Sequence, residues 1–374
     1  MRRTIATAAA LVVLVVPSAA VAAGARGAAT YTFTKIADTA DGFSSFGCPA
    51  LNGRGTAAFG ATVLDPETFD STESIERGRG GPLTTIAAER DDFSFFGRPS
   101  INRHGAVSVA ATFDEQDGEA IVRGRGGPLT EIARTEPGRF NFFTFDTSVN
   151  DRGVVAFTAE LDERFDFDEG LFAGDGDGPA ATRYLASTSR FQGSIAPPSI
   201  NERGQIAFSE TRDDDVSGIF RQSHGCFATI ADDTGPFQGF SDRPSLNNNR
   251  RVAFTAFNSE GSEQFVLVGR GGEVEVRART DSEYQSFDDP SLNDRDRVAF
   301  SAELDSFEDG LFRGPDPVRD RVIRSGDRLF GSRVVGVQAC REALNSSGQI
   351  AFQAQLADGR EVIGRANRRG PDSP

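Results

Sequence analysis

The stretch VNDRGVVAF (149–157) combines an aliphatic–Asn pair, a glycine three residues after the asparagine and an apolar run that ends in phenylalanine. Six further segments share most of this pattern: LNGRGTAAF (51–59), INRHGAVSV (101–109), INERGQIAF (200–208), LNNNRRVAF (246–254), LNDRDRVAF (292–300) and LNSSGQIAF (344–352). The seven asparagines lie 46 to 52 residues apart: Asn52, Asn102, Asn150, Asn201, Asn247, Asn293 and Asn345. A repeat of this length is typical of propellers and solenoids.

Each repeat is expected to form four short strands. The first ends at the aliphatic–Asn pair, and a turn follows because asparagine bonds its own backbone and glycine accepts a positive φ. The apolar run, for example 155–161, is the second strand, since it is rich in β-branched and aromatic residues. Segments such as 310–314 and 83–87 supply the third and fourth strands. Four consecutive strands joined by short turns make one propeller blade.

The glycine position departs from this rule in two repeats, where Arg250 and Asp296 occupy it. Aspartate tolerates a positive φ moderately, and arginine tolerates it poorly. We therefore expect the fifth turn to shift by one residue onto Asn249.

The two ends of the repeat region are complementary. The last repeat ends after a third strand at 361–364, and the segment YTFTKIA (31–37) matches the missing fourth strand. A ring whose last blade is completed by the opposite chain end leaves no exposed sheet edge there. The sequence therefore predicts an all-β fold, a seven-bladed β-propeller of four-stranded blades closed by an N-terminal strand. An open solenoid is the alternative.

The N-terminus has the features of a secretory signal peptide. Arg2 and Arg3 precede an apolar run (5–16) that is short for a membrane span, and small residues at 20 and 22 fit a cleavage site. We expect a signal peptide over 1–22, the propeller over 23–367 and a disordered polar tail over 368–374. The predicted location is extracellular, with no membrane span after removal of the signal. An uncleaved anchor is the alternative.

Composition and charge argue against several functions. The chain has 40 basic and 55 acidic residues, a net charge of −15 and two histidines. It lacks the surplus of basic groups that neutralises nucleic-acid phosphates, so we predict no nucleic-acid partner. Two histidines leave little for acid–base catalysis or a multi-histidine metal site. The sequence also has no nucleophile elbow, zinc-protease motif or phosphate-binding loop. We predict no cofactor and no catalytic residues, and favour a protein that is not an enzyme.

The seven segments resemble those of bacterial exported proteins named for an N-x-x-G-x-x-A-F tandem repeat, a family with varied C-terminal anchoring segments. The resemblance covers essentially the whole chain after the predicted signal peptide. It implies export but no activity, because that family is functionally uncharacterised. The C-terminus GRANRRGPDSP (364–374) has no apolar stretch, so we expect release rather than anchoring.

Two cysteines precede the asparagines of the first and last repeats, Cys48 by four residues and Cys340 by five. These repeats are neighbours in a closed ring. The two thiols therefore either form a disulfide that ties the closure or remain free and buried. Cys226 is left over, and with His224 it offers too few ligands for zinc.

In a propeller of this topology, the loops from each fourth strand to the next blade and the loops between second and third strands share one face, here named the loop face. The first set is rich in phenylalanine and the second in acids. The candidates for ligand binding are Phe95, Phe96, Phe142, Phe143, Asp166, Asp168 and Asp214. The alternative is that the phenylalanines fill the wedge between blades and the acids keep the protein soluble.

The loop around Asp166 and Asp168 is a candidate calcium site, because carboxylates are the preferred ligands of calcium. Leu171 stands where an EF-type loop needs glycine, so we predict no metal site. The favoured function is a secreted, monomeric, non-enzymatic propeller that binds an unidentified protein or cell-wall glycan through the loop face. The alternatives are a carboxylate-dependent glycan hydrolase or lyase and a structural envelope component.

Overall fold

The structure is a computed structural model that describes residues 29–89, 93–113, 118–136, 139–161, 169–176, 183–187, 191, 196–258, 260–280 and 283–369. The signal peptide predicted over 1–22 and residues 370–374 of the predicted tail lie outside these ranges. No helix within the described ranges is long and apolar enough to cross a membrane.

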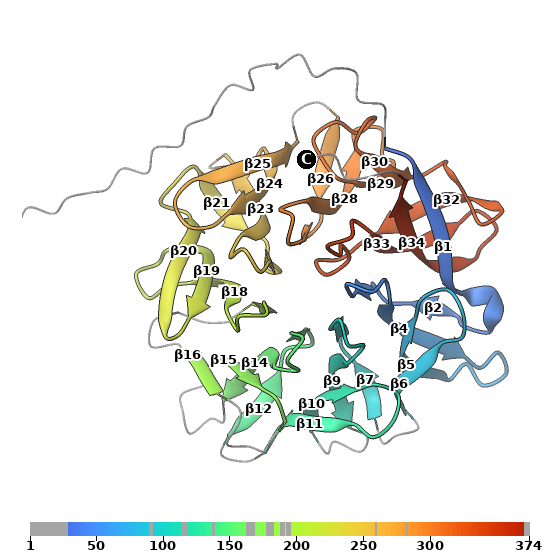
Figure 1. Cartoon of the computed structure of the whole chain (residues 1–374), viewed down its shortest axis with the longest axis horizontal. Helices are drawn as coiled ribbons and strands as arrows, with labels where there is room; N and C mark the ends of the chain where they lie inside the picture. The colour runs from blue at the N-terminus through green and yellow to red at the C-terminus, as the bar shows by residue number, and fades with distance from the viewer. Residues whose placement is uncertain are drawn as a thin grey trace, which may run out of the picture.

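Seven small antiparallel sheets surround a central axis, and each is one blade of a β-propeller (Figure 1). In most blades the innermost strand is interrupted and is described as two short pieces. The first three blades comprise β2 (Ser45–Phe46), β3 (Ala50–Leu51), β4 (Ala57–Leu64), β5 (Ser71–Gly78) and β6 (Thr84–Ala88); β7 (Phe93–Phe96), β8 (Ser100–Ile101), β9 (Val107–Phe113), β10 (Glu119–Gly124) and β11 (Thr130–Arg134); and β12 (Phe140–Phe143), β13 (Ser148–Val149), β14 (Val155–Leu161), β15 (Glu169–Gly174) and β16 (Arg183–Ser187).

The next three blades follow the same order from the axis outward. They comprise β17 (Ser199–Ile200), β18 (Ile206–Thr211), β19 (Ser217–Ser223) and β20 (Cys226–Asp232); β21 (Phe237–Phe240), β22 (Ser245–Leu246), β23 (Val252–Asn258), β24 (Gln264–Gly269) and β25 (Val274–Arg279); and β26 (Tyr284–Phe287), β27 (Ser291–Leu292), β28 (Val298–Leu304), β29 (Asp309–Phe312) and β30 (Arg321–Arg324).

The seventh blade joins the two ends of the chain. It contains β31 (Arg328–Leu329), β32 (Ser332–Gln338), β33 (Ile350–Leu356), β34 (Glu361–Arg368) and, as its outermost strand, β1 (Tyr31–Asp38). β1 runs antiparallel to β34, from Tyr31 opposite Arg368 to Asp38 opposite Val362 (Figure 1). The predicted seven-bladed fold and its closure by an N-terminal strand are confirmed, and the open solenoid is excluded.

The core consists of seven layers, each formed by two neighbouring blades. The phenylalanine that ends the repeat pattern lies in the second strand of six blades and is at most 1% exposed: Phe59, Phe157, Phe208, Phe254, Phe300 and Phe352. Val109 replaces it in the second blade. Second strands are buried on both sides because a blade packs on each, which explains their continuous apolar runs.

The repeated asparagines form a ring of hydrogen bonds around the axis. In Asn102, Oδ1 accepts from the backbone N–H groups of His104 and Ala106, both at 3.0 Å, and so holds its own turn. Its Nδ2 donates to the carbonyl oxygen of Asn150 in the next blade at 3.0 Å. The other asparagines repeat this contact, and Nδ2 of Asn345 completes the ring at the carbonyl of Asn52, at 3.0 Å.

The fifth turn contradicts the expected shift onto Asn249. Arg250 itself takes the left-handed conformation, with φ of 67°. Its N–H donates to the carbonyl of Asn247 at 3.1 Å, as Gly55 does to Asn52 at 3.0 Å. The bonds from Asn247 to its turn and to the next blade hold the register, and these bonds outweigh the preference of arginine for negative φ.

Candidate functional site

The antiparallel order of each blade separates two faces of the ring. Asn turns lie at the end of the first strand, on the same side as the turns between third and fourth strands. This side, opposite the loop face, is named the turn face. A site on either face is therefore built from equivalent connections of neighbouring blades.

The four candidate phenylalanines on the loop face divide into two kinds. Phe96 and Phe143 are 7% and 0% exposed and pack between blades, whereas Phe95 and Phe142 are 40% and 37% exposed. Successive side chains of a strand point to opposite sides, so each Phe–Phe pair puts one ring in the core and one in solvent. Core packing accounts for Phe96 and Phe143, and Phe95 and Phe142 remain available to a ligand.

Phe145 joins the two exposed rings in a group that we name the aromatic cluster: Phe95, Phe142 and Phe145. Phe145 is 40% exposed. Its ring centroid lies 5.0 Å from that of Phe95 and 5.6 Å from that of Phe142, both edge to face. Three contacting aromatic rings on a surface are typical of a binding site, since they offer apolar area at little entropic cost.

A close backbone contact between the second and third blades holds the aromatic cluster together. The N–H of Arg98 donates to the carbonyl oxygen of Phe145 at 3.0 Å. A Cβ atom on Gly97 would lie 1.9 Å from that oxygen, so only glycine permits this approach. The position of Phe145 is thus set by the backbone before any ligand arrives.

A groove of about 460 Å³ lies beside the aromatic cluster. Phe95 and Phe145 line it together with Glu73, Arg98 and other residues of the first three blades. Arg98 is exposed, and no carboxylate of the described residues lies within ion-pair distance of it. Its Nη1 lies 3.8 Å from Sγ of Cys340. The groove therefore combines an apolar wall with a guanidinium group that an anionic or hydroxyl-bearing ligand can reach.

Arg243 supplies the second guanidinium of the groove, and it is neutralised by the protein. Its Nε lies 2.5 Å from Oδ2 of Asp146, and its Nη1 lies 3.9 Å from Asp289. Burial raises the pKa of Asp289, although Arg243 and Arg341 oppose this rise. Burial also raises the pKa of the adjacent Asp288, and the charge of Asp309 adds to the effect.

The segment after Cys340 lies across the central axis. Arg341, 6% exposed, donates from Nη1 to the carbonyl of Pro197 at 3.0 Å and from Nη2 to that of Thr147 at 3.1 Å. Oγ of Ser148 donates to Oε1 of Glu342 at 2.8 Å. These contacts join the seventh blade to the third and fourth blades, on the far side of the ring.

Cys340 is also bonded to the first blade. In the structure Cys48 and Cys340 form a disulfide, with Cα atoms 6.1 Å apart, and Cys226 is free and exposed. The disulfide thus joins the first and last blades next to the segment that crosses the axis.

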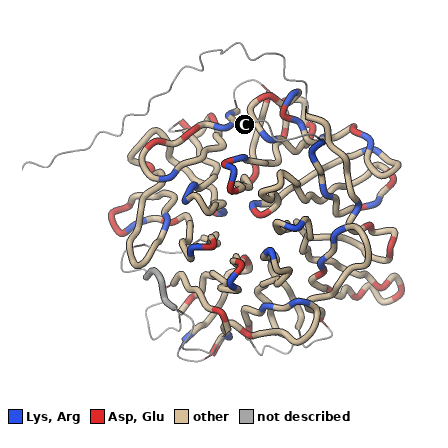
Figure 2. The backbone as a smooth tube through the Cα atoms, viewed as in Figure 1, with Lys and Arg blue, Asp and Glu red and all other residues tan. Residues whose placement is uncertain are grey.

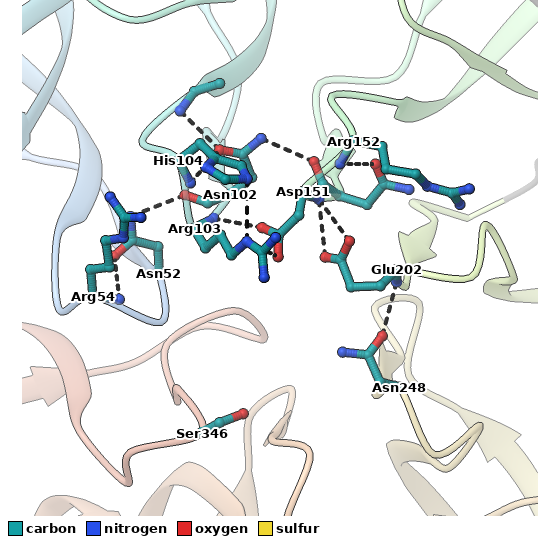
Figure 3. Close-up of polar contacts among 12 residues, drawn as sticks. Asn52, Arg54, Asn102, Arg103, His104, Asp151, Arg152, Glu202, Asn248 and Ser346 are labelled. Atoms are coloured by element: carbon teal, nitrogen blue, oxygen red, sulfur yellow. Dashed lines mark hydrogen bonds and ion pairs between the residues drawn. The ribbon is translucent and has the colours of Figure 1, made fainter.

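On the turn face, the residues that follow the asparagines line a cavity of about 410 Å³ around the axis (Figure 3). Backbone N–H groups bond to the side chain of the next blade: Arg103 to Asp151 at 2.8 Å, Asp151 to Glu202 at 3.0 Å, and Glu202 to Asn248 at 2.9 Å. Burial and the charge of Asp151 raise the pKa of Glu202. These carboxylates are engaged by backbone donors, so their first role is to join neighbouring turns.

The acidic candidates lie apart from the aromatic cluster or outside the described residues. Asp214 is in the β18–β19 turn of the fourth blade, where Nε of Arg212 donates to its Oδ1 at 2.9 Å. That hydrogen bond lowers the pKa of Asp214. Asp166 and Asp168 lie outside the described residues. Over the ranges that the structure covers, no three His, Cys, Asp or Glu side chains are grouped to hold a metal.

Sequence reasoning missed Phe145, Arg98 and Arg243 as candidates. The inner strands β7 and β12 begin and end with a buried phenylalanine. Two exposed residues separate the buried ones, because the register shifts at a β-bulge between Phe93 and Phe95 and between Phe140 and Phe142, so strict alternation would not have identified the exposed rings. No local sequence pattern predicts that Arg243 lies at the groove, because its contact with Asp146 joins residues 97 positions apart.

Comparison with known protein families matches residues 85–368 to a family of unknown function (DUF7453). No curated protein matches the chain.

Solved structures share the fold at very low identity. The acylaminoacyl peptidase of Pyrococcus horikoshii aligns with a TM-score of 0.55 and 12% identity over 87% of this chain and 52% of that one. Prolyl oligopeptidase B from Galerina marginata aligns with a TM-score of 0.57 and 9% identity, over 89% of this chain and 50% of that one. An oligogalacturonate lyase in complex with manganese aligns with a TM-score of 0.54 and 9% identity, over 92% of this chain and 99% of that one. The chain spans about half the length of the peptidases, and these likenesses concern the fold alone.

Proposed function

We propose that this chain, which belongs to the family of unknown function DUF7453, is a binding module whose partner docks on the loop face at the aromatic cluster and the adjoining groove. One observation carries the proposal. Three phenylalanines, 37% to 40% exposed, contact one another beside a groove of about 460 Å³ that also holds Arg98. Exposed aromatic groups of this kind mark interaction sites more often than they serve folding.

The partner class follows from the chemistry of the groove. Phe95 and Phe145 offer an apolar wall, and Arg98 offers a cation a few residues away. A partner that presents an apolar face next to a carboxylate or hydroxyl groups fits both. A cell-wall glycan and an extended polypeptide each supply this combination, through a sugar ring or an aliphatic side chain.

We also propose that the protein is exported and acts outside the cell as a monomer. The signal-peptide pattern over 1–22 and the resemblance to exported N-x-x-G-x-x-A-F repeat proteins support export. The Cys48–Cys340 disulfide supports it as well, because disulfides persist in oxidising compartments and are rare in the cytosol.

The test is a binding screen with the mature protein and its variant Phe95→Ala/Phe142→Ala/Phe145→Ala. The screen contains cell-wall glycans and extracellular proteins. We expect the triple variant to lose at least about tenfold in affinity, since each exposed ring contributes about 1 kcal/mol or more to a contact. Its circular dichroism spectrum should match that of the unaltered protein, which checks that the fold is kept when these partly buried rings are removed.

The matched control is Phe69→Ala/Phe307→Ala. Both rings are 77% exposed, lie in loops between second and third strands, and do not line the groove. The control should bind as the unaltered protein does. An equal loss of affinity in both variants would show that binding is non-specific apolar adhesion. An unchanged affinity of the triple variant would contradict the proposed site.

A carboxylate-dependent glycan hydrolase or lyase is the second candidate. The observation that favours it is Asp289, which lies 3.9 Å from Arg243 of the groove and whose pKa is raised by burial. A raised carboxyl pKa is characteristic of a general acid in glycosidases. Assaying every bound glycan for product release, with the protein and with Asp289→Asn, distinguishes this function from binding alone.

A further inference from the structure

Arginine residues gather on the turn face, although the chain as a whole is acidic. The Asn turns contribute Arg54, Arg152, Arg203 and Arg295, and the turns between third and fourth strands contribute Arg79, Arg125 and Arg270. In Figure 2, basic residues lie at the turns that surround the axis. The same face also carries carboxylates, such as Asp151, Glu202 and Asp294, so an excess of positive charge is local to parts of it.

One part of this face is a cavity of about 340 Å³ where the fourth and fifth blades meet, here named the arginine cleft. It is lined by Arg203, Asn249, Arg250, Arg251, Arg270 and Asp296. Arg251 is paired with Glu275 at 2.5 Å and with Asp296 at 4.0 Å. Within the described residues, the other three arginines have no carboxylate at ion-pair distance. The cleft thus carries a surplus of positive charge.

A fifth arginine, Arg221, lies next to the cleft. Nη1 of Arg221 donates to the backbone carbonyl of Arg250 and, at 3.1 Å, to that of Arg270. Its Nε is buried and has no hydrogen-bond partner in the described part of the chain. Burial and the charges of Arg250 and Arg270 lower the pKa of Arg221. Arg221 thus orients two of the lining residues and adds to their mutual repulsion.

The backbone at Arg250 is strained. Its φ is 67°, at a position where five other repeats have glycine with φ of 74° to 83°: Gly55, Gly105, Gly153, Gly204 and Gly348. A side chain at such an angle is unfavourable, and glycine would relieve the strain. Strain of this kind gathers at functional sites, where the side chain is needed in that position.

We propose that the arginine cleft binds a tetrahedral oxyanion, the phosphate or sulfate group of a larger ligand. Guanidinium groups bind such oxygens through paired, charge-assisted hydrogen bonds. Arg203, Arg250 and Arg270 approach the cavity from two blades, and none of them has a carboxylate of the described residues at ion-pair distance. The cleft lies on the turn face and the proposed partner site on the loop face, so each can fail without the other.

The experiment measures binding of inorganic phosphate and of inorganic sulfate by calorimetry at low ionic strength. The protein is compared with Arg250→Gly, which restores the glycine of the other repeats. We expect saturable binding by the unaltered protein and at least about tenfold weaker binding by the variant, as for loss of one charge-assisted contact. The variant should unfold at a higher temperature, because the strain is removed.

Arg54→Gln is the matched control, since Arg54 lies in the equivalent Asn turn of the first blade, on the same face but outside the cleft. Its affinity should stay within about twofold of the unaltered protein. Two further probes, a glycerol phosphate oligomer and a sulfated oligosaccharide, identify the source of the anion. Absence of saturable binding to all four probes overturns the proposal, as does an equal loss in Arg54→Gln or undiminished binding by Arg250→Gly.

Discussion

At the scale of single residues, Glu210 is the clearest exception to the repeat. It lies in β18, where the second strands of the other blades have a buried alanine: Ala61, Ala111, Ala159, Ala256, Ala302 and Ala354. Glu210 is 9% exposed, and its Oε2 has no hydrogen-bond partner within the described residues. Burial, together with the charges of Glu169 and Asp242, raises the pKa of Glu210 to about 7.

This raised pKa predicts a pH-dependent loss of stability. Between pH 4.5, the ordinary pKa of a glutamate, and about pH 7, the folded protein holds a proton that the unfolded chain has released, so stability falls as pH rises. Above pH 7, the raised pKa of Glu210 lowers the free energy of unfolding by about 3 kcal/mol. Glu210→Ala should therefore be more stable than the unaltered protein at pH 8, with a smaller gain at pH 5, in urea unfolding monitored by circular dichroism.

Glu210→Gln is the companion variant, because it keeps the size of the side chain and removes its titration. Its stability should lack the fall between pH 5 and pH 8. An unaltered protein equally stable at both pH values would show that Glu210 does not titrate in this range.

At the scale of elements, the Asn turn sets both the bend and the contact with the next blade. Asn102 is 4% exposed and makes three hydrogen bonds at 3.0 Å, two within its turn and one to Asn150. The same side chain thus ends one strand and fixes the spacing to the next blade. This dual role explains why asparagine recurs in all seven repeats.

We predict that Asn102→Ala lowers the free energy of unfolding by about 3 kcal/mol, since about 1 kcal/mol is lost per buried hydrogen bond and the Asn150 carbonyl loses one of its donors. Chemical denaturation measures this loss. The control is Asn141→Ala, whose exposed side chain bonds only to Glu160 within the described residues, at 3.0 Å. Similar destabilisation by both variants would contradict a special role for the Asn turn.

At the scale of the whole molecule, two links join the first and last parts of the chain in addition to the asparagine ring. One is the ladder between β1 and β34, which pairs Tyr31 with Arg368 and ends at Asp38 and Val362. The other is the Cys48–Cys340 disulfide, which spans 292 residues. The ladder pairs the outer side of β34 with β1 and so joins the two ends of the chain, and the disulfide restricts the unfolded chain.

Cys48→Ser/Cys340→Ser should keep the propeller, because the ladder and the asparagine ring remain. Its free energy of unfolding should fall by about 3 to 5 kcal/mol, the effect of a disulfide that closes a long loop. Guanidinium unfolding with and without a dithiol reductant measures the loss. Cys226→Ser, at an exposed free thiol, is the control and should be unchanged. An unaltered midpoint in the double variant would mean that the disulfide adds nothing to closure.

The strands and their order could be predicted because they depend on local pattern. The second strand expected at 155–161 matches β14 residue for residue. The conformation of the turn at Arg250 could not be predicted. The local preference of arginine disfavours a positive φ there, and hydrogen bonds to the next blade impose it. The same holds for Phe95 and Phe96, which look alike in the sequence and differ in exposure through the pleat of one short strand.

The sequence by itself determined the number of blades, the turn chemistry and the closure of the ring, because periodic apolar runs and repeated Asn turns act over a few residues each. Only the tertiary structure decided which side chains meet, such as Phe95 with Phe145 and Arg243 with Asp146. These contacts join different blades. Their geometry depends on how the blades are rotated and packed around the axis, which no local pattern encodes.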